Sequence, residues 1–169
     1  MKEIPLTRGL VAQVDDRDYA TLMRLAPWHA VNGPRTFYAV HSYSNGHGRG
    51  CAIGKLLMHH VIMGRKYGGR DLDHADGNGL NNQRANLRWS TRAQNRANSA
   101  KQRTGANKFK GVSFIARLSK FQAYIGSKPK KYLGVFTSEE DAARAYDAAA
   151  IVMYGEFARP NFPQVKENQ

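Results

Sequence analysis

The fold of this chain is decided by the stretch Asp73-His74-Ala75-Asp76-Gly77-Asn78-Gly79, followed by Asn86-Leu87-Arg88 and Gln94-Asn95-Arg96-Ala97-Asn98. It places a carboxylate beside an imidazole, a turn-forming segment after both, and amide side chains one short element later. Asp76-Gly77 and Asn78-Gly79 predict a bend directly after His74. Neighbouring residues of a regular strand point to opposite faces, so we expect this bend to bring Asp73 and His74 toward one target.

These residue types suit the hydrolysis of a phosphodiester. A hard divalent cation prefers oxygen ligands, which the Asp73 carboxylate and the Asn95 amide supply, with Asn98 as an alternative ligand. His74 is then left as a general base that takes a proton from an attacking water. The cation stabilises charge that grows on the phosphate. Nothing in the sequence supplies a second carboxylate cluster, which favours one metal ion over two.

A helix is expected to begin at Thr91, because Thr91-Arg92-Ala93-Gln94 has the spacing of a capping box. Asn95 then lies in its second turn, and Asn98 shares its face. Arg88, Arg92 and Arg96 recur every four residues, and we interpret them as phosphate contacts. The alternative is a solvated, charged helix face.

The order Asp-His-x-Asp-Gly-Asn, Asn-Leu-Arg and Gln-Asn-x-x-Asn resembles the HNH endonucleases of phage and group I intron origin, which carry a ββα-metal motif. The resemblance implies that His74 is the general base and Asp73 a metal ligand. It gives Asn86 the catalytic role of bracing the loop through hydrogen bonds. Asn95 matches the last position, often His in the family, as in the HNN variant. An amide oxygen favours Mg²⁺ or Mn²⁺ over zinc.

Other polar residues near this stretch have simpler interpretations. Short polar side chains at bends bond to their own backbone, which makes turn formers of Asp76, Asn78, Asn81 and Asn82. His59 and His60 lie in the apolar segment 56–62. One of them is expected to be a core histidine, and a role for His59 near the site stays open.

The charge of the chain points to a polyanionic partner. Lys and Arg total 26 against 13 acidic residues, a formal net charge of +13, which is typical of proteins that bind nucleic acid or anionic lipid. No segment has the length and apolarity of a membrane span, and no signal-peptide core follows Met1. The single Cys51 excludes an intramolecular disulfide and multi-cysteine zinc sites. We expect double-stranded DNA as partner, no membrane contact, and a cytoplasmic location.

The distribution of charge predicts two domains. Residues 101–138 contain nine basic side chains and no acid, and acids return at Glu139. Residues 1–98 are interpreted as the first domain, with the site motif at 56–98. Residues 99–106 form a linker, 107–163 a second domain and 164–169 a tail. In the first domain we expect strands over 6–14, 28–31 and 37–43, a loop over 46–50, and helices over 15–25 and 53–63.

The second domain is predicted to be an antiparallel meander followed by a helix. The segments 108–112, 121–125 and 131–136 alternate or are aromatic, with turn residues between them. Thr137-Ser138-Glu139-Glu140 has capping-box spacing, and Gly155 is placed to end the helix. A stripe at helical spacing is interpreted as core: Ala142, Ala145, Tyr146, Ala149, Val152 and Met153.

Residues 107–163 are similar to the AP2 DNA-binding domain of plant transcription factors. Gly-Val, aromatic-x-Ala-x-Ile, Tyr-Leu-Gly-x-Phe, Glu-Glu-Asp-Ala-Ala-Arg-Ala-Tyr-Asp and Asn-Phe-Pro carry the resemblance. It implies a three-stranded sheet in the major groove with the helix behind it. Several arginines and tryptophans of the plant domains are absent, so the target sequence does not carry over. The resemblance and the basic stretch together give a set of DNA-binding candidates: Lys108, Lys110, Ser113, Arg117, Lys120, Tyr124, Lys128, Lys130, Lys131 and Tyr132.

The sequence therefore predicts an α+β protein with an HNH-like nuclease domain and an AP2-like domain. The expected activity is that of a phage-type homing endonuclease, a monomer that nicks DNA with one Mg²⁺ or Mn²⁺ in the cytoplasm of a bacterial or phage-infected cell. A DNA-binding regulator with an inactive nuclease domain is the alternative. A binder of structured RNA is a third possibility.

Overall fold

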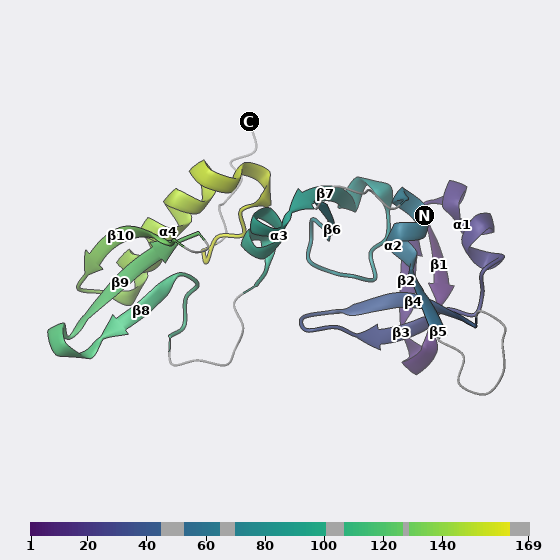
Figure 1. Ribbon diagram of the computed structural model, residues 1–169, viewed down its shortest axis with the longest axis horizontal. Coiled ribbons are helices and arrows are strands. Elements are labelled where there is room, and N and C mark those ends of the chain that lie inside the picture. Colours follow the sequence, from purple (N-terminus) through teal and green to yellow (C-terminus); the bar gives the residue numbers. More distant parts are fainter. Residues whose placement is uncertain (45–52, 65–69, 101–106, 127–128, 163–169) are drawn as a thin grey trace. The chain divides into compact units, whose positions relative to one another are not determined.

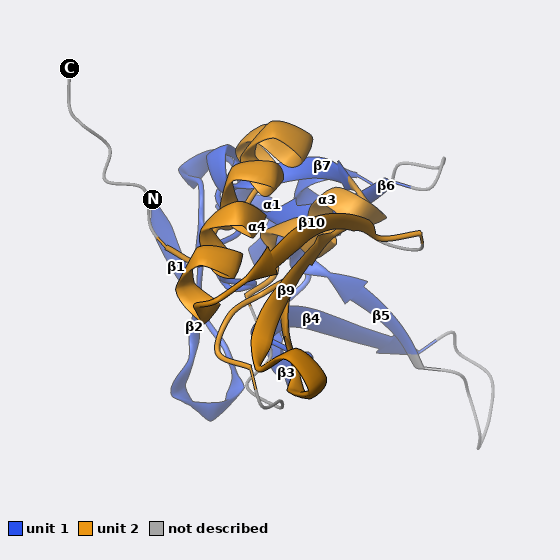
Figure 2. Ribbon diagram, turned by 90° about the vertical axis from the view of Figure 1, so that its left-hand side faces the viewer, with its two compact units in different colours: residues 1–90 blue, residues 91–169 orange. Residues whose placement is uncertain are grey.

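The computed structural model describes residues 1–44, 53–64, 70–100, 107–126 and 129–162 (Figure 1). The chain divides into two compact units, Met1–Ser90 and Thr91–Gln169 (Figure 2). Each unit is defined internally, whereas the position of one relative to the other is not determined. The expected linker at 99–106 lies mostly outside the described residues, and the predicted domain boundaries stay a prediction. Helices and strands are mixed in both units, so the α+β class is confirmed.

Unit 1 combines small antiparallel sheets with short helices. Its elements are β1 (Lys2–Pro5), β2 (Val11–Val14), α1 (Asp16–Met23), β3 (His29–Asn32), β4 (Phe37–Ser44), β5 (Ile53–Leu57), α2 (Met58–Met63), β6 (Arg70–His74) and β7 (Leu87–Thr91), with 3-10 turns at Thr7–Gly9 and Arg84–Asn86. The sheets are β1-β2, β3-β4-β5 and β6-β7. Their shared core contains Ile4, Val14, Leu22, Trp28 and Met58, and the Trp28 Nε1 donates to the Leu22 carbonyl at 2.8 Å.

Two predictions for this unit are wrong. Residues 6–14 are not one strand, because a 3-10 turn at Thr7–Gly9 separates β1 from β2. Residues 53–63 are not one helix, because Ile53–Leu57 pairs with β4 and the helix begins only at Met58. Gly54 lies under the Tyr43 ring, where an added Cβ would be 2.2 Å from Cζ. A short apolar run does not distinguish strand from helix, and here pairing with β4 decides.

Unit 2 is an antiparallel meander with helices, as the sequence predicts, but its first strand is Val112–Ile115, so the prediction of a strand over 108–112 is wrong. Its elements are α3 (Arg92–Asn98), β8 (Val112–Ile115), β9 (Lys120–Ile125), β10 (Lys131–Phe136) and α4 (Glu139–Tyr154), with 3-10 turns at Ala116–Leu118 and Gly155–Phe157. The three strands form an antiparallel sheet in the order β10-β9-β8. Val112 and Ala123 of the sheet pack with Ala142 and Ala143 of α4. Small residues at this contact allow the helix to lie close to the strands.

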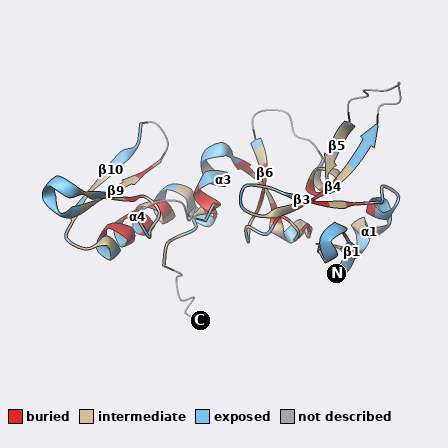
Figure 3. Ribbon diagram, turned by 90° about the horizontal axis from the view of Figure 1, so that it is seen from below, coloured by how far each residue is buried: buried red, intermediate tan, exposed pale blue. Residues whose placement is uncertain are grey.

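The buried face of α4 differs from the expected stripe in its last turns (Figure 3). Ala142, Ala143, Tyr146 and Ala150 are buried, whereas Val152 is 89% and Met153 47% exposed. Val152 follows Ala150 by about 200° around the helix, which turns it away from the sheet. The cap is Ser138, whose side chain accepts from the Asp141 amide, so the predicted capping box at Thr137 is wrong by one residue. Gly155 ends the helix as expected.

None of the helices in the described ranges combines the length and apolarity needed to cross a membrane.

Gly111 provides a test of the packing in unit 2. Its φ is +79°, and an added Cβ would lie 2.0 Å from the Tyr146 ring. We expect Gly111→Ala to lower the free energy of unfolding by about 3 kcal/mol, through overpacking added to backbone strain. Gly126→Ala is the control, because Gly126 has φ +92° and nothing within 4 Å of an added Cβ. It should cost about 1 kcal/mol. Equal losses in urea unfolding of the two variants would contradict this packing.

Candidate active site

The hairpin of β6 and β7 positions the residues of the motif. The Ala75 amide donates to the Asn86 carbonyl at 2.8 Å, and the Ser90 hydroxyl donates to the Asp71 carbonyl at 3.3 Å. Between these contacts, Arg88 forms an ion pair with Asp73. Successive residues along β6 therefore pair with successively earlier residues of β7, which is the pattern of antiparallel strands. Asp73 therefore lies opposite Arg88, and the chain reverses between Ala75 and Asn86.

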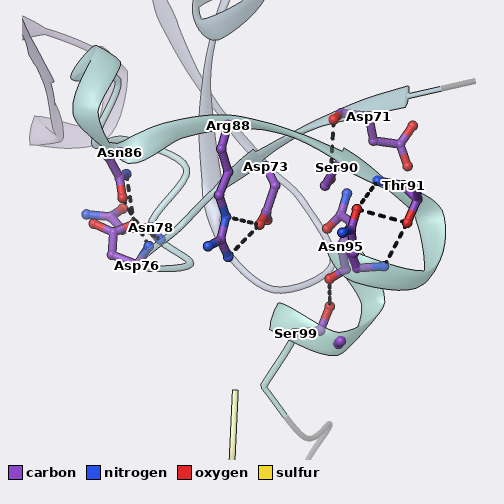
Figure 4. Close-up of polar contacts among 12 residues, drawn as sticks. Asp71, Asp73, Asp76, Asn78, Asn86, Arg88, Ser90, Thr91, Asn95 and Ser99 are labelled. Carbon is purple, nitrogen blue, oxygen red and sulfur yellow. Dashed lines mark hydrogen bonds and ion pairs between the residues drawn. The ribbon is translucent and has the colours of Figure 1, made fainter. Parts of the chain in front are cut away.

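Hydrogen bonds from Asn86 close the loop between the two strands (Figure 4). Its Nδ2 donates to Asp76 Oδ1 at 2.9 Å and to the Asn81 carbonyl at 2.8 Å, while its Oδ1 accepts from the Asp76 amide at 3.0 Å. Burial raises the pKa of Asp76, but hydrogen bonds from Asn78, Asn81 and Asn86 outweigh it and hold this pKa below its ordinary value. The bonds made by Asn86 are of the bracing kind that the resemblance implies.

The N-terminal elements β2 and α1 also form hydrogen bonds with this loop. The Gln13 amide donates to the Leu80 carbonyl at 2.9 Å, and the Asn82 amide donates to the Gln13 carbonyl at 2.8 Å. Arg84 forms a bidentate pair with Asp18 of α1, with two bonds of 2.8 Å. Residues of β2 and α1 thus support the loop, a function for the N-terminal segment that the sequence left open.

His74 is the last residue of β6 and is 5% exposed. Its Nε2 lies 3.4 Å from Asn82 Oδ1. The Asn82 Nδ2 donates to the carbonyls of Gly79 and Leu80, which orients the amide so that its oxygen faces the imidazole. An amide oxygen only accepts, so this contact favours the tautomer with the proton on Nε2 and the lone pair on Nδ1.

The contact between Asn82 and His74 is a feature of the candidate site that sequence reasoning missed. Its side chain is fully buried, yet we interpreted it as a turn former. Asn82 does bond to the backbone of the bend, through the Gly79 and Leu80 carbonyls, and so do its neighbours, since Asp76 accepts from the Asn78 amide and Asn78 from the Leu80 amide. The doublet Asn81-Asn82 carries no local signal that separates the two, because contact with His74 depends on the closed loop.

Burial lowers the pKa of His74, even though Asn82, Asp76 and Asp73 act to raise it. The imidazole is therefore neutral near neutral pH. The His59 ring lies 5.0 Å from the His74 ring, centroid to centroid, and the Tyr38 ring lies 5.9 Å away. Burial, with smaller effects of His74 and His60, lowers the pKa of His59 to about 3. His59 is thus a buried histidine that also borders the candidate site.

Asp73 contacts a different neighbour. Its Oδ2 accepts from Arg88 Nε at 3.1 Å, and Arg88 Nη2 lies 3.1 Å from the same oxygen (Figure 4). The bend begins at Ala75, after both residues, and the contacts described for Asp73 and His74 involve different neighbours, Arg88 and Asn82. The predicted phosphate contact of Arg88 stays a prediction, because its guanidinium is engaged by Asp73 and its side chain is only 17% exposed.

The helix after the hairpin begins as predicted. Thr91 Oγ1 accepts from the Gln94 amide at 3.2 Å, and Gln94 Oε1 accepts from the Thr91 amide at 2.8 Å, which completes a capping box. Asn95 is half-buried in the second turn, Asn98 is buried, and Arg92 and Arg96 are exposed. Asn95 and Asn98 belong to unit 2. Their distances from Asp73 therefore stay a prediction.

The donor groups near β6 fit a hard divalent cation. Within the described ranges, no group of three or more His, Cys, Asp or Glu side chains is arranged to hold a metal. The candidate donors are one buried carboxylate, that of Asp73, and amide oxygens. Mg²⁺ retains several waters and takes only one or two protein carboxylates, so this sparse oxygen set is compatible with it.

The exposed face of the unit 2 sheet gathers several DNA-binding candidates. Gln122 Nε2 donates to Ser113 Oγ at 3.0 Å, and the Tyr124 hydroxyl donates to Gln122 Oε1 at 3.3 Å. The Tyr132 ring lies 5.3 Å from the Tyr124 ring. Ala123 and Ile125, which alternate with these residues, are buried. Gln122 is absent from the predicted DNA-binding residues, although it lies two residues before Tyr124 in the same strand and therefore on the same face.

The basic DNA-binding candidates of residues 107–163 do not share one environment. Five are exposed: Lys108, Arg117, Lys120, Lys130 and Lys131. Lys128 lies outside the described residues. Lys110 differs, because its ammonium group donates to the backbone carbonyls of Ala97, Ser99 and Arg159. This internal engagement argues against the DNA contact predicted for Lys110.

Comparisons with known proteins find matches for both the HNH-like and the AP2-like segment. Residues 56–97 match the HNH endonuclease family model. An uncharacterized HNH endonuclease of Acanthamoeba polyphaga mimivirus is 33% identical over 114 residues, which cover 64% of this chain and 59% of that protein. APETALA2-like protein 2 of Oryza sativa is 40% identical over 67 residues, or 38% of this chain and 15% of that protein. Ethylene-responsive transcription factor 3 of Nicotiana tabacum is 58% identical over 36 residues, covering 21% and 16%.

These matches confirm the resemblance to HNH endonucleases together with an AP2-like segment. The HNH match supports DNA nuclease activity, and the plant matches support DNA binding. The chain spans 59% of the mimivirus protein and 15% of the rice protein.

The buried His59 makes stability depend on pH. The folded protein holds its pKa at about 3, below the ordinary 6.5, so the unfolded chain binds a proton that the folded chain does not. The folding stability that depends on a neutral His59 is fully present above about pH 6.5 and is lost as pH falls toward about 3. By about pH 5 the loss should be about 2 kcal/mol. Urea unfolding of wild type and His59→Gln at about pH 7.5 and 5 should show this extra loss in wild type alone.

His29→Gln is the matched control, because His29 is a half-buried histidine of β3. It should keep the pH dependence of wild type. An identical pH response of wild type and His59→Gln would contradict the assignment.

Proposed function

We propose that this chain is a DNA endonuclease of the HNH homing type, which nicks double-stranded DNA with a single divalent cation, Mg²⁺ or Mn²⁺. One observation carries the proposal. The imidazole of His74 is neutral and is oriented through Nε2 by Asn82, in the segment that matches the HNH endonucleases. This leaves Nδ1 in the protonation state that a general base requires. Asn86 supports the arrangement by closing the loop that carries Asn82.

In the proposed reaction, His74 Nδ1 takes a proton from a water in line with the scissile phosphorus. Asp73 and Asn95 would hold the cation, with Asn98 as the alternative ligand. When bound, the cation supplies electrostatic stabilisation of the phosphate and the departing 3′ oxygen. Arg88 adds positive charge next to Asp73, and Arg92 and Arg96 are exposed for contact with phosphate.

The AP2-like segment would bring this chemistry to DNA. A sheet face that presents Ser113, Tyr124 and Tyr132, bordered by exposed lysines and Arg117, fits contact with a groove and its phosphates. The net charge of +13 favours the same partner. We propose that the chain acts as a monomer in the cytoplasm of a bacterial or phage-infected cell.

The ion pair between Asp73 and Arg88 favours one other function. It occupies a carboxylate oxygen that the cation would need, as expected for a DNA-binding regulator with an inactive nuclease domain. Binding of DNA without nicking under Mg²⁺ or Mn²⁺ would establish the regulator. Competition between duplex DNA and structured RNA tests the RNA-binding alternative.

Removal of the general base should separate cutting from binding. We expect His74→Ala to slow the nicking of supercoiled plasmid by about 100-fold or more in Mg²⁺, because the water loses its proton acceptor. DNA affinity should change less than about twofold, since His74 is buried and uncharged. His29→Ala, in β3, is the control, and thermal unfolding verifies that each variant is folded. Nicking by His74→Ala at the rate of wild type would refute the proposed mechanism.

Salt dependence tests the phosphate contacts. The logarithm of the DNA association constant should fall with that of salt concentration, with a slope of about −0.9 for each neutralised phosphate. Removing one contact, as in Lys120→Ala or Arg117→Ala, should make the slope shallower by about one. Lys2→Ala removes an equal charge from β1 and serves as control. Unchanged slopes in both of these variants would exclude Lys120 and Arg117 from the interface.

A further inference from the structure

Helix α3 is too short to be stable by itself. It contains seven residues, and isolated helices below about 12 residues are marginal in water. Its stability must therefore come from its ends and from tertiary contacts. At the first end, the capping box of Thr91 and Gln94 satisfies backbone amides. The carbonyls of the last turn need a partner too.

Lys110 provides that partner within unit 2. Its Nζ lies 2.5 Å from the Ala97 carbonyl oxygen, 2.9 Å from that of Ser99 and 3.1 Å from that of Arg159. An ammonium group has three protons, and three acceptors use all of them. A positive charge at the end of a helix also interacts favourably with the helix dipole. Charge-assisted hydrogen bonds of this kind are about twice as strong as neutral ones.

Lys110 is itself held to α4. Asn161 Oδ1 accepts from the Lys110 amide at 2.7 Å, and Asn161 Nδ2 donates to the Lys110 carbonyl at 3.1 Å. The buried carboxylate of Asp147, on α4, accepts from the Asn161 amide at 2.7 Å and from its Nδ2 at 2.9 Å. A continuous series of hydrogen bonds therefore runs from α4 through Asn161 and Lys110 to the end of α3.

The backbone around Lys110 is fixed by the packing and hydrogen bonding of Gly111. Gly111 has φ +79°, and its position under the Tyr146 ring leaves no room for a Cβ. The Gly111 carbonyl accepts from the Tyr124 amide at 2.9 Å, which attaches this segment to β9. The Lys110 Nζ also lies 5.8 Å from the centre of the Tyr146 ring. The lysine is thus fixed by the sheet and by α4 before it reaches α3.

We propose that Lys110 is a positioning residue that fixes α3, and with it Asn95, to the sheet and helix α4 of unit 2. This inference rests on the proposed function, in which Asn95 is a metal ligand. The side chain of Asn95 then takes its place from the module that binds DNA. Lys110 acts through the backbone of α3 and touches neither the cation nor DNA.

Lys110 could position α3 or contact a DNA phosphate, and replacing it would have different effects in the two cases. A positioning residue affects the nicking rate at saturating DNA and the Mg²⁺ concentration for half-maximal rate. Small misplacement of a catalytic group costs about tenfold or more. A phosphate contact instead affects DNA affinity and makes the salt slope shallower by about one, with the saturated rate unchanged.

The experiment uses the full chain and four variants: Lys110→Met, Lys110→Gln, Lys110→Arg and the control Lys2→Met. Amide hydrogen exchange is measured first, on metal-free protein. In Lys110→Met we expect exchange in α3 to accelerate by about tenfold, with α4 and β9 unchanged. Lys110→Arg should restore most of the protection, because a guanidinium also donates several charged hydrogen bonds. Lys2→Met removes an exposed lysine of β1 and should resemble wild type.

The second measurement is single-turnover nicking at saturating DNA, titrated with Mg²⁺. We expect Lys110→Met to slow the saturated rate by about tenfold and to raise the half-maximal Mg²⁺ concentration. DNA affinity and salt slope should remain those of Lys2→Met, and Lys110→Arg should recover rate and metal dependence together. If Lys110→Met unfolds, Lys110→Gln, which keeps two donors and loses the charge, supports the same comparison.

Unchanged exchange in α3 overturns the inference, and so does a loss of DNA affinity with an unchanged saturated rate. Faster exchange in α3 combined with wild-type nicking overturns the link to Asn95. A wild-type protein that does not nick in Mg²⁺ or Mn²⁺ refutes the proposed function and, with it, the role assigned through Asn95. The exchange measurement still decides whether Lys110 holds α3, so the two failures are distinguishable.

Discussion

The closed loop between β6 and β7 is the constraint on which the candidate site depends. Asn86 reaches back to Asp76 and to the Asn81 carbonyl, and this brings the ends of the loop together. Closure places Asn82 against the imidazole of His74. The same loop is bonded to β2 through Gln13. Without closure, His74 would lose both the amide that selects its tautomer and the burial that keeps it neutral.

Local patterns predicted the parts of the site whose contacts lie within a few residues. The capping box at Thr91 and the Asx turns at Asp76 and Asn78 involve neighbours in the sequence, so their spacing is visible. The contact of Lys110 with Ala97 and Arg159 joins distant positions and has no such pattern. For the same reason, residues 53–57 were assigned to a helix, because only pairing with β4 identifies them as a strand.

The resemblance to AP2 domains placed Lys110 among the DNA-binding residues, whereas the structure gives its ammonium group three backbone acceptors. A motif position can therefore be kept while its function changes, because a long cation serves a helix end as well as a phosphate. Helix α3 groups with unit 2, although all but its last residue lies in the segment that matches the HNH endonucleases. The segment that matches the HNH endonucleases therefore continues beyond unit 1 into unit 2.

The most direct test of the central claim is to locate the metal. Crystals of the full chain with nicked DNA and Mn²⁺ should give an anomalous peak roughly 2 Å from an oxygen of Asp73 and from the Asn95 amide oxygen. The His74 Nδ1 should face the scissile phosphate and should not contact the ion. A peak coordinated by His74, or a metal bound away from Asp73, would contradict the account.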